Sequence, residues 1–244
     1  MKSELFAIQD LSPADRHEMI TLLCTQFDGV TEDSFTSDLA DKNWVLLIRN
    51  AEAQIRAFST LHIYPTCFEG RDLWVLFSGD TVVSPELWRS SSLMQAWWPA
   101  ILGLQVAYGA EPLYWLLISS GYRTYRYLPA LARSFHPQVG HETEPQDLRL
   151  VNWLASKRFG RNFDPATGVV TLDHPYQLRP ELRDIPQERL SDPNITHFLQ
   201  LNPGFADGDE LVCLARITPA NLTRLGQRLV DHALPYELKS AIPA

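Results

Sequence analysis

The fold prediction starts from the apolar run Trp74-Val75-Leu76-Phe77-Ser78-Gly79-Asp80-Thr81-Val82-Val83 and from the segments that follow it. These are Ser84-Pro85, the helical run 86–104, the apolar run Leu113-Tyr114-Trp115-Leu116-Leu117-Ile118, and residues 121–127. The two apolar runs predict strands that are buried on both faces. Ser84-Pro85 ends the first strand, because proline cannot donate to a strand ladder. The stretch therefore predicts strand, tight polar loop, helix, strand and helix, with the second strand parallel to the first and the helix crossing over.

Three consecutive serines, Ser90, Ser91 and Ser92, lie near the start of the predicted helix. A loop of small residues entering a helix offers free backbone N–H groups and the positive end of the helix dipole, which suits a phosphate or pyrophosphate. Ligands of open α/β sheets bind at the carboxyl ends of such strands. The alternative is that the serines only cap the helix.

The rest of the chain predicts an α/β three-layer fold with a central mixed, mostly antiparallel sheet. Before residue 74 the order is strand, two helices and two strands, at 5–11, from Ser12-Pro13, from Thr31, at 44–48 and at 55–64. After residue 128 we expect helices at 130–135, 148–159, 192–200 and 218–232, with strands within 164–173 and at 210–217. We expect residues 1–137 to form a core. We expect residues 138–244 to form an α/β extension that packs on this core. The extension would either cover the side where an acceptor substrate binds or complete the sheet.

Composition excludes several classes of function. The chain has 244 residues, a formal net charge of −8 and a pI of about 5.3, which argues against nucleic acid or an anionic membrane surface as the main partner. An acidic surface tolerates a cationic amine. The three cysteines show neither a disulfide framework nor zinc spacing, so we expect no metal and a reducing compartment. Without a signal run or a long apolar segment, we expect a cytoplasmic protein with no membrane insertion.

The order of elements over about the first 137 residues resembles the GCN5-related N-acetyltransferase (GNAT) superfamily. Val83-Ser84-Pro85 matches the Val-x-Pro of that family, and Arg89 matches the first position of its pyrophosphate loop. Ser92 and Met94 stand where the family has glycine and glycine or alanine, so the loop is divergent. The segment Tyr114 to Pro129 is similar to a bacterial subgroup of GNAT-like proteins.

The resemblance implies that acyl-CoA is a co-substrate. The residues implied to hold it follow the central strand, line the divergent loop or lie on the later helix: Thr81, Val82, Val83, Arg89, Ser90, Ser91, Ser92 and Arg123. Arg123 has a second interpretation, as a solvated side chain. An acyl carrier protein is a further candidate donor.

Gly79 predicts a bulge in the central strand, because glycine inside a strand often marks a bulge or a close backbone approach. The resemblance implies that Ser78 and Gly79 lie at the acyl carbonyl and the substrate. Amide formation from a thioester requires an uncharged amine, so a base must take the ammonium proton. A bulge would aim Asp80 into the cleft as that base, directly or through water. The alternative is that Asp80 bonds locally to a turn or to Thr81.

A tyrosine near residue 127 is implied as the acid that protonates the leaving thiolate. Of the family pattern Asn-x-x-Ala-x-x-Leu-Tyr, only Tyr127 matches, and Tyr122 and Tyr125 are rivals. All three can instead be helix aromatics that pack on the sheet. His62, on the preceding strand, is a candidate substrate-binding residue, although a lone strand histidine is more often structural.

The sequence therefore predicts a GNAT-type N-acyltransferase that moves an acetyl or a longer fatty acyl group to a primary amine. The acceptor is a small molecule or a peptide, with the amine side chain of a peptide in a natural-product pathway as one candidate. Trp97-Trp98 on the crossover helix are mostly core and can also line an acyl chain. The alternative is a non-catalytic GNAT-like protein that binds acyl-CoA or a small molecule, which the replaced glycines favour. A hydrolase has little support, because no Gly-x-Ser-x-Gly elbow appears.

Overall fold

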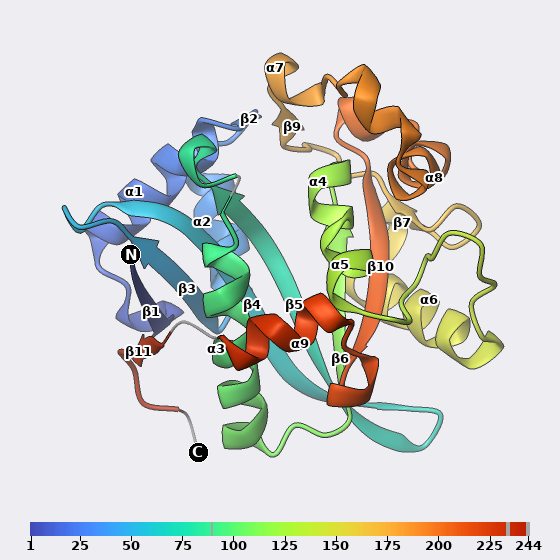
Figure 1. The fold of residues 1–244 in the computed structure, drawn as a ribbon, viewed down its shortest axis with the longest axis horizontal. Helices are drawn as coiled ribbons and strands as arrows, with labels where there is room; N and C mark the ends of the chain where they lie inside the picture. Colours follow the sequence, from blue (N-terminus) through green and yellow to red (C-terminus); the bar gives the residue numbers. More distant parts are fainter. Residues whose placement is uncertain (89, 233–234, 243–244) are drawn as a thin grey trace. The chain divides into compact units, whose positions relative to one another are not determined.

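The structure is a computed structural model that describes residues 1–88, 90–232 and 235–242. The chain forms two compact units (Figure 1). The first comprises Met1–Gln26, Val30–Leu113 and Gln227–Ala244, and the second comprises Phe27–Gly29 and Tyr114–Gly226. The boundary expected at 137/138 falls inside the second unit, and the roles assigned to its two sides remain predictions.

The first unit is built on a mostly antiparallel sheet with the strand order β11-β1-β3-β4-β5. Its strands are β1 (Lys2–Ala7), β3 (Trp44–Arg49), β4 (Ile55–Phe68), β5 (Arg71–Val83) and β11 (Tyr236–Leu238). β11 pairs in parallel with β1, whereas the pairs β1–β3, β3–β4 and β4–β5 are antiparallel. The predicted antiparallel meander of three strands is therefore confirmed.

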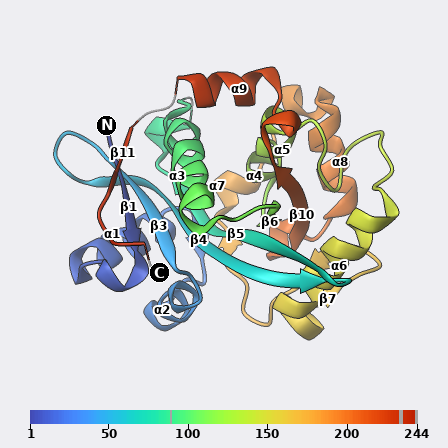
Figure 2. The same ribbon diagram turned by 90° about the horizontal axis from the view of Figure 1, so that it is seen from below.

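Helices cover both faces of this sheet (Figure 2). α1 (Pro13–Cys24) and α2 (Glu32–Ala40) lie on one face, and α3 (Ser92–Tyr108) lies on the other. Ser12 and Thr31 are the N-caps of α1 and α2 and accept hydrogen bonds from the backbone of their first turns, so the predicted helix starts are confirmed. A hydrogen bond of 3.0 Å from Trp44 Nε1 to Tyr108 Oη marks the α3 face.

Two boundaries in the first unit differ from the prediction. The strand expected at 5–11 ends at Ala7, and Ile8–Asp10 form a 3-10 turn, η1. The helix expected at 86–104 begins only at Ser92, because Pro85–Leu87 form a separate 3-10 turn, η2, closed by Leu87 N–H on the Ser84 carbonyl. α3 runs on to Tyr108, where Gly109 takes the left-handed conformation that ends many helices.

The second unit contains its own strands in the order β6-β10-β8-β7 and a pair β2–β9. The strands are β2 (Phe27–Asp28), β6 (Leu113–Ser119), β7 (Phe163–Asp164), β8 (Val169–Val170), β9 (Gln177–Leu178) and β10 (Glu210–Ile217). The helices are α4 (Tyr122–Tyr125), α5 (Tyr127–Leu131), α6 (Pro145–Phe159), α7 (Pro180–Arg183) and α8 (Pro193–Leu201), with short 3-10 turns at Gly160–Asn162, Gln187–Ser191, Phe205–Asp207 and Pro219–Asn221. The strand predicted at 210–217 is confirmed.

Three predicted helices of the C-terminal half have different bounds. The single helix expected at 121–127 is split into α4 and α5, because Pro129 lacks the N–H that would bond the Tyr125 carbonyl. The helix expected at 130–135 is wrong beyond Leu131, where Ala132 is extended and pairs with Leu222. The last helix, α9 (Arg224–Asp231), begins after a 3-10 turn rather than at Thr218.

Among the helices that the described residues form, none combines the length and the apolar character of a membrane span.

Candidate functional site

A bulge interrupts the pairing of β4 with β5 at the position that the glycine predicted. Ser59 pairs with Thr81 and Leu61 pairs with Ser78. One residue, Thr60, therefore lies opposite two, Gly79 and Asp80. An extra residue of this kind shifts the alternation of side chains by one position along the bulged strand.

The bulge places Asp80 on the face of the sheet that carries α2. Leu61 pairs with Trp44, whose indole bonds α3, so Leu61 and its partner Ser78 lie on the α3 face. Thr81 lies on that face too, because its hydroxyl is 2.9 Å from the hydroxyl of Ser59, its cross-strand partner. Gly79 and Asp80, between Ser78 and Thr81, both belong to the opposite face. A regular strand would have put Asp80 beside Ser78.

The Asp80 carboxyl is buried without a hydrogen-bond partner on one oxygen. Oδ2 is inaccessible to solvent and meets no donor among the described residues, although the residue as a whole is half-buried. The pKa of Asp80 is raised to about 7, because burial and, to a smaller extent, the charge of Asp38 raise it more than the charge of Lys42 lowers it. A carboxyl that titrates near neutral pH is suited to accept a proton in catalysis.

A buried lysine lies beneath the bulge. The Lys42 side chain is 0% exposed, and its Nζ donates to the Asp38 carbonyl at 2.9 Å and to Asp38 Oδ1 at 2.8 Å. Nζ also lies 5.5 Å from the centre of the Phe77 ring. The hydroxyl of Thr60, opposite the bulge, is buried and has no partner among the described residues. Asp38, Lys42, Thr60 and Asp80 are called the bulge cluster below.

Gly79 is required by the close approach of this lysine. An ideal Cβ at position 79 would lie 2.5 Å from Lys42 Cε and 2.7 Å from Thr60 Oγ1. We expect Gly79→Ala to lower the free energy of unfolding by about 1–3 kcal/mol, because either neighbour must move in a packed interior. Urea denaturation measures the change.

The matched control for Gly79→Ala is the same substitution in a Lys42→Ala background, which removes the lysine stem. The double-mutant cycle should give a coupling of about 1 kcal/mol, with the alanine tolerated better once Lys42 is truncated. Equal costs of Gly79→Ala in both backgrounds would show that the lysine does not set the requirement for glycine.

The serine loop leads into α3 without a side-chain cap. Ser91 is the N-cap residue and makes no capping hydrogen bond, and Ser90 Oγ bonds Ser92 Oγ at 3.1 Å. Ser92 N–H donates to Ser90 Oγ at 3.4 Å, whereas the N–H groups of the next residues in the first turn have no acceptor within the helix and are available to an anion. Met94 is buried, so the side chain that replaces the family's small residue points into the core. Arg89 lies outside the described residues.

The end of β5 is held by pairing with β4 and by two side chains. Thr81, Val82 and Val83 pair with Ser59, Phe58 and Ala57. The Val83 carbonyl accepts hydrogen bonds from Gln26 Nε2 at 2.6 Å and from Trp88 Nε1 at 2.7 Å. These contacts fix the end of β5 and tie it to Trp88.

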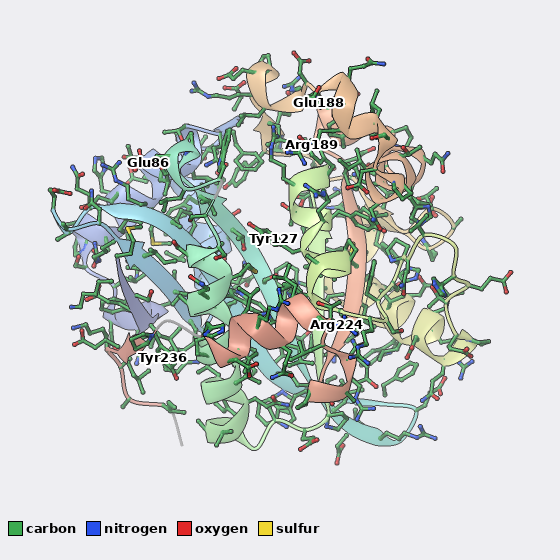
Figure 3. All side chains as sticks on the ribbon, viewed as in Figure 1. Glu86, Tyr127, Glu188, Arg189, Arg224 and Tyr236 are labelled. Carbon is green, nitrogen blue, oxygen red and sulfur yellow. The ribbon has the colours of Figure 1, made fainter. Side chains whose placement is uncertain are left out.

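Tyr127 belongs to the second unit, at the start of α5 (Figure 3). Its hydroxyl makes no hydrogen bond within the described part of the chain, and burial raises its pKa, so it stays protonated at neutral pH and can donate. Its rivals have structural environments. Tyr125 is fully buried and donates to the Pro137 carbonyl at 2.7 Å, and Tyr122 is buried under the Arg123 guanidinium at 4.9 Å.

The other two predicted site residues have neighbours that constrain them. Arg123 Nη1 donates to the Leu182 carbonyl at 2.9 Å within the second unit. His62 pairs with Phe77, so it lies on the same face as the bulge cluster, and its ring centre is 4.5 Å from that of Tyr64. Among the described residues, no group of three or more histidine, cysteine or acidic side chains is placed to hold a metal ion.

The sequence prediction missed Asp38, Lys42 and Thr60. The available signal was the spacing of Asp38 and Lys42, which are four residues apart at the end of the helix that Thr31 caps and therefore share one helix face. The burial of Lys42 depends on the missing side chain of Gly79, which only the folded sheet reveals.

Comparisons with known protein families and with curated proteins find no match. Among solved structures, the chain is similar to a conserved protein of unknown function and probable N-acyltransferase from Enterococcus faecalis V583, with 15% identity over 55% of this chain and 33% of that one and a TM-score of 0.40. It is also similar to the GNAT family N-acetyltransferase YhbS from Escherichia coli in complex with CoA. The identity is 14% over 52% of this chain and 68% of that one, and the TM-score is 0.39. A third similar structure is glucosamine-6-phosphate N-acetyltransferase from Arabidopsis thaliana. The identity is 15% over 47% of this chain and 82% of that one, and the TM-score is 0.36.

The matched region spans about a third, 33%, of the Enterococcus chain. All three TM-scores are under 0.5 and all identities are under 25%.

Proposed function

We propose that this protein is an N-acyltransferase that moves an acyl group from acyl-CoA to a primary amine. The observation that carries the proposal is the bulge at Gly79-Asp80, which holds a carboxyl of raised pKa in the interior of the first unit. An amine must lose its ammonium proton before it can attack a thioester, and Asp80 is the proposed acceptor of that proton, directly or through water.

The serine loop is the proposed phosphate site. Its support is the uncapped N-terminus of α3 and the small side chains of Ser90, Ser91 and Ser92 around it. In this proposal the last residues of β5 hold the pantetheine, and Arg89 and Arg123 remain candidate phosphate contacts. Ser78 and Gly79 remain candidate contacts of the acyl carbonyl, and His62 of the acceptor.

Tyr127 is the proposed acid for the leaving thiolate. Its support is its own environment, with a protonated hydroxyl that has no partner within the described part of the chain. We expect Tyr127→Phe to lower kcat by about a hundredfold or more, because a positioned general acid typically contributes between about 10² and 10⁴ in rate. The free energy of unfolding should change little, since the hydroxyl makes no hydrogen bond within the described part of the chain that would be lost. Steady-state kinetics and urea denaturation measure the two effects.

Tyr125→Phe is the matched control. It removes the same hydroxyl from a neighbouring tyrosine but breaks the hydrogen bond to the Pro137 carbonyl. It should cost about 1 kcal/mol of stability and leave kcat within a few-fold. The reverse pattern, with activity lost in Tyr125→Phe and kept in Tyr127→Phe, would contradict the role of Tyr127.

Ser92→Asp tests the serine loop. A carboxylate at the first residue of α3 would repel the phosphates of the coenzyme, so we expect the Kd for acetyl-CoA to rise at least tenfold. Isothermal titration calorimetry measures it. The control is Ser12→Asp, which also places an acid at a helix N-terminus, that of α1, and should leave the Kd unchanged. An unchanged Kd in Ser92→Asp would place the phosphates elsewhere.

The acyl group is proposed to be acetyl or a longer fatty acyl chain. Trp97 and Trp98 are both buried in the first unit, with ring centres 5.4 Å apart, which supports a mainly structural role for this pair. Trp98 Nε1 has no partner among the described residues. The acceptor is proposed to be a small-molecule or peptide amine.

A non-catalytic acyl-CoA-binding protein is the second candidate, and the serine and methionine in place of the family's small loop residues favour it. Thermal-shift titration with acetyl-CoA, a long-chain acyl-CoA and an acyl carrier protein, followed by mass spectrometry of an amine panel, separates the two. Stabilisation with a new amide supports the transferase, and stabilisation without any amide supports the binding protein. No shift with any donor would overturn both.

A further inference from the structure

In the bulge cluster, the one cation, Lys42, forms hydrogen bonds with Asp38 but none with Oδ2 of Asp80. Lys42 is bonded to Asp38 through both the carbonyl and Oδ1, and the Asp38 side chain is 41% exposed. Asp80 Oδ2 is buried and receives no hydrogen bond within the described residues. The cluster has zero net charge only when one carboxyl is protonated, and the proton is favoured on the buried, unpartnered one.

The position of the lysine is fixed from three sides. Asp38 of α2 holds its ammonium group, Gly79 of β5 gives its stem room to pass, and Phe77 lies beside Nζ. In this arrangement Lys42 Nζ donates to Asp38 and not to Asp80 Oδ2. Electrostatic interactions are strong in the interior of a protein. A change in the charge of Lys42 or of Asp38 therefore changes the pKa of Asp80.

Other titratable groups on this face are accounted for. His62 of β4 belongs to the second residue pair beyond the bulge, and its ring lies against Tyr64. Glu18 of α1 accepts the backbone N–H of Ile55 at 2.8 Å, at the start of β4. The groups whose charges act on the Asp80 carboxyl are Asp38 and Lys42.

We infer that Lys42 is a positioning residue that sets when Asp80 is ionised, and that Asp38 competes with Asp80 for its charge. Asp38 thereby keeps Asp80 unpaired and basic enough to take a proton. The inference rests on the proposed function only in naming Asp80 as the base.

Two substitutions should move the titration of Asp80 in opposite directions. Lys42→Met keeps an apolar side chain of similar length next to Gly79 and removes the positive charge. The pH midpoint of the Asp80 titration should therefore rise by at least one unit. Asp38→Asn keeps an acceptor for Lys42 and removes the competing charge, so the midpoint should fall by at least one unit. Each shift is a tenfold change in proton affinity.

The experiment is an NMR titration of ¹³Cγ-labelled aspartate in the full-length protein, with the Asp80 signal assigned from Asp80→Asn. Asp41→Asn is the matched control, because Asp41 is exposed and directly precedes Lys42, at the C-cap of α2. It should move the midpoint by no more than a few tenths of a unit. If Lys42→Met does not fold, Asp38→Asn still tests the inference.

Opposite shifts from Lys42→Met and Asp38→Asn support the inference. Unchanged midpoints, shifts of the same sign, or a shift in Asp41→Asn as large as in Asp38→Asn would overturn it. The titration needs no substrate, so its outcome is separate from that of the proposed function. If the shifts are opposite and the protein makes no amide, the inference about Lys42 is supported and the proposed transferase function is rejected.

Discussion

Asp80→Asn should lower kcat for amide formation by about a thousandfold. The carboxyl is the proposed acceptor of the ammonium proton, and a positioned base typically contributes between about 10² and 10⁴ in rate. Asparagine has nearly the same shape and cannot take a proton, so coenzyme binding at the serine loop should survive. The measurement is kcat, with the Kd for acyl-CoA determined alongside by calorimetry.

Asp72→Asn is the control for this prediction. Asp72 lies on the same strand, is exposed, and pairs with Cys67 of β4 far from the bulge. It should keep wild-type kcat. If Asp80→Asn retained more than a tenth of the wild-type kcat, another group would be the base.

The second large effect concerns stability. The pKa of Asp80 is raised in the folded state, to about 7 from the ordinary 3.8. A raised folded pKa favours folding while the group is protonated, so the contribution is complete below the unfolded pKa and is lost as the pH rises through 7. The contribution of Asp80 to the free energy of unfolding should therefore fall by roughly 3 kcal/mol between pH 4 and pH 8.

Asp80→Asn should lack this slope, because an amide does not titrate. The variant should be more stable than the wild type at pH 8 and closer to it at pH 4, although it is inactive. Urea denaturation at several pH values measures both curves, and their difference isolates Asp80 from other titrating groups. Parallel curves would mean that the carboxyl titrates alike in the folded and unfolded states.

Local signals in the sequence predicted much of the fold. Ser12, Thr31 and Asp192 each cap the helix that the sequence placed after them, because a side-chain oxygen two or three residues before a free N–H is a local interaction. Gly79 predicted the bulge, because glycine inside a strand often marks a bulge or a close backbone approach. Two of the boundaries that failed involve 3-10 turns at Pro85 and Pro219, which continue an apparent helical pattern without being α-helix.

The face of Asp80 could not be predicted from the sequence. Alternation along residues 74–83 assigns Asp80 to the side of Ser78, and the bulge reverses this by one residue. The burial of Lys42 is equally invisible, because it requires α2 and β5 to meet where Gly79 has no side chain. Long-range packing of this kind leaves no local pattern.

The pH dependence of amide formation tests the central claim most directly. With saturating acyl-CoA and amine, the proposal predicts that the wild-type rate of amide formation, followed by mass spectrometry, rises with an apparent pKa near 7, the value of Asp80. Asp80→Asn should show neither that rate nor that rise. Amide formed at wild-type rates by Asp80→Asn, with the same pH profile, would contradict the assignment of the bulge carboxyl as the base.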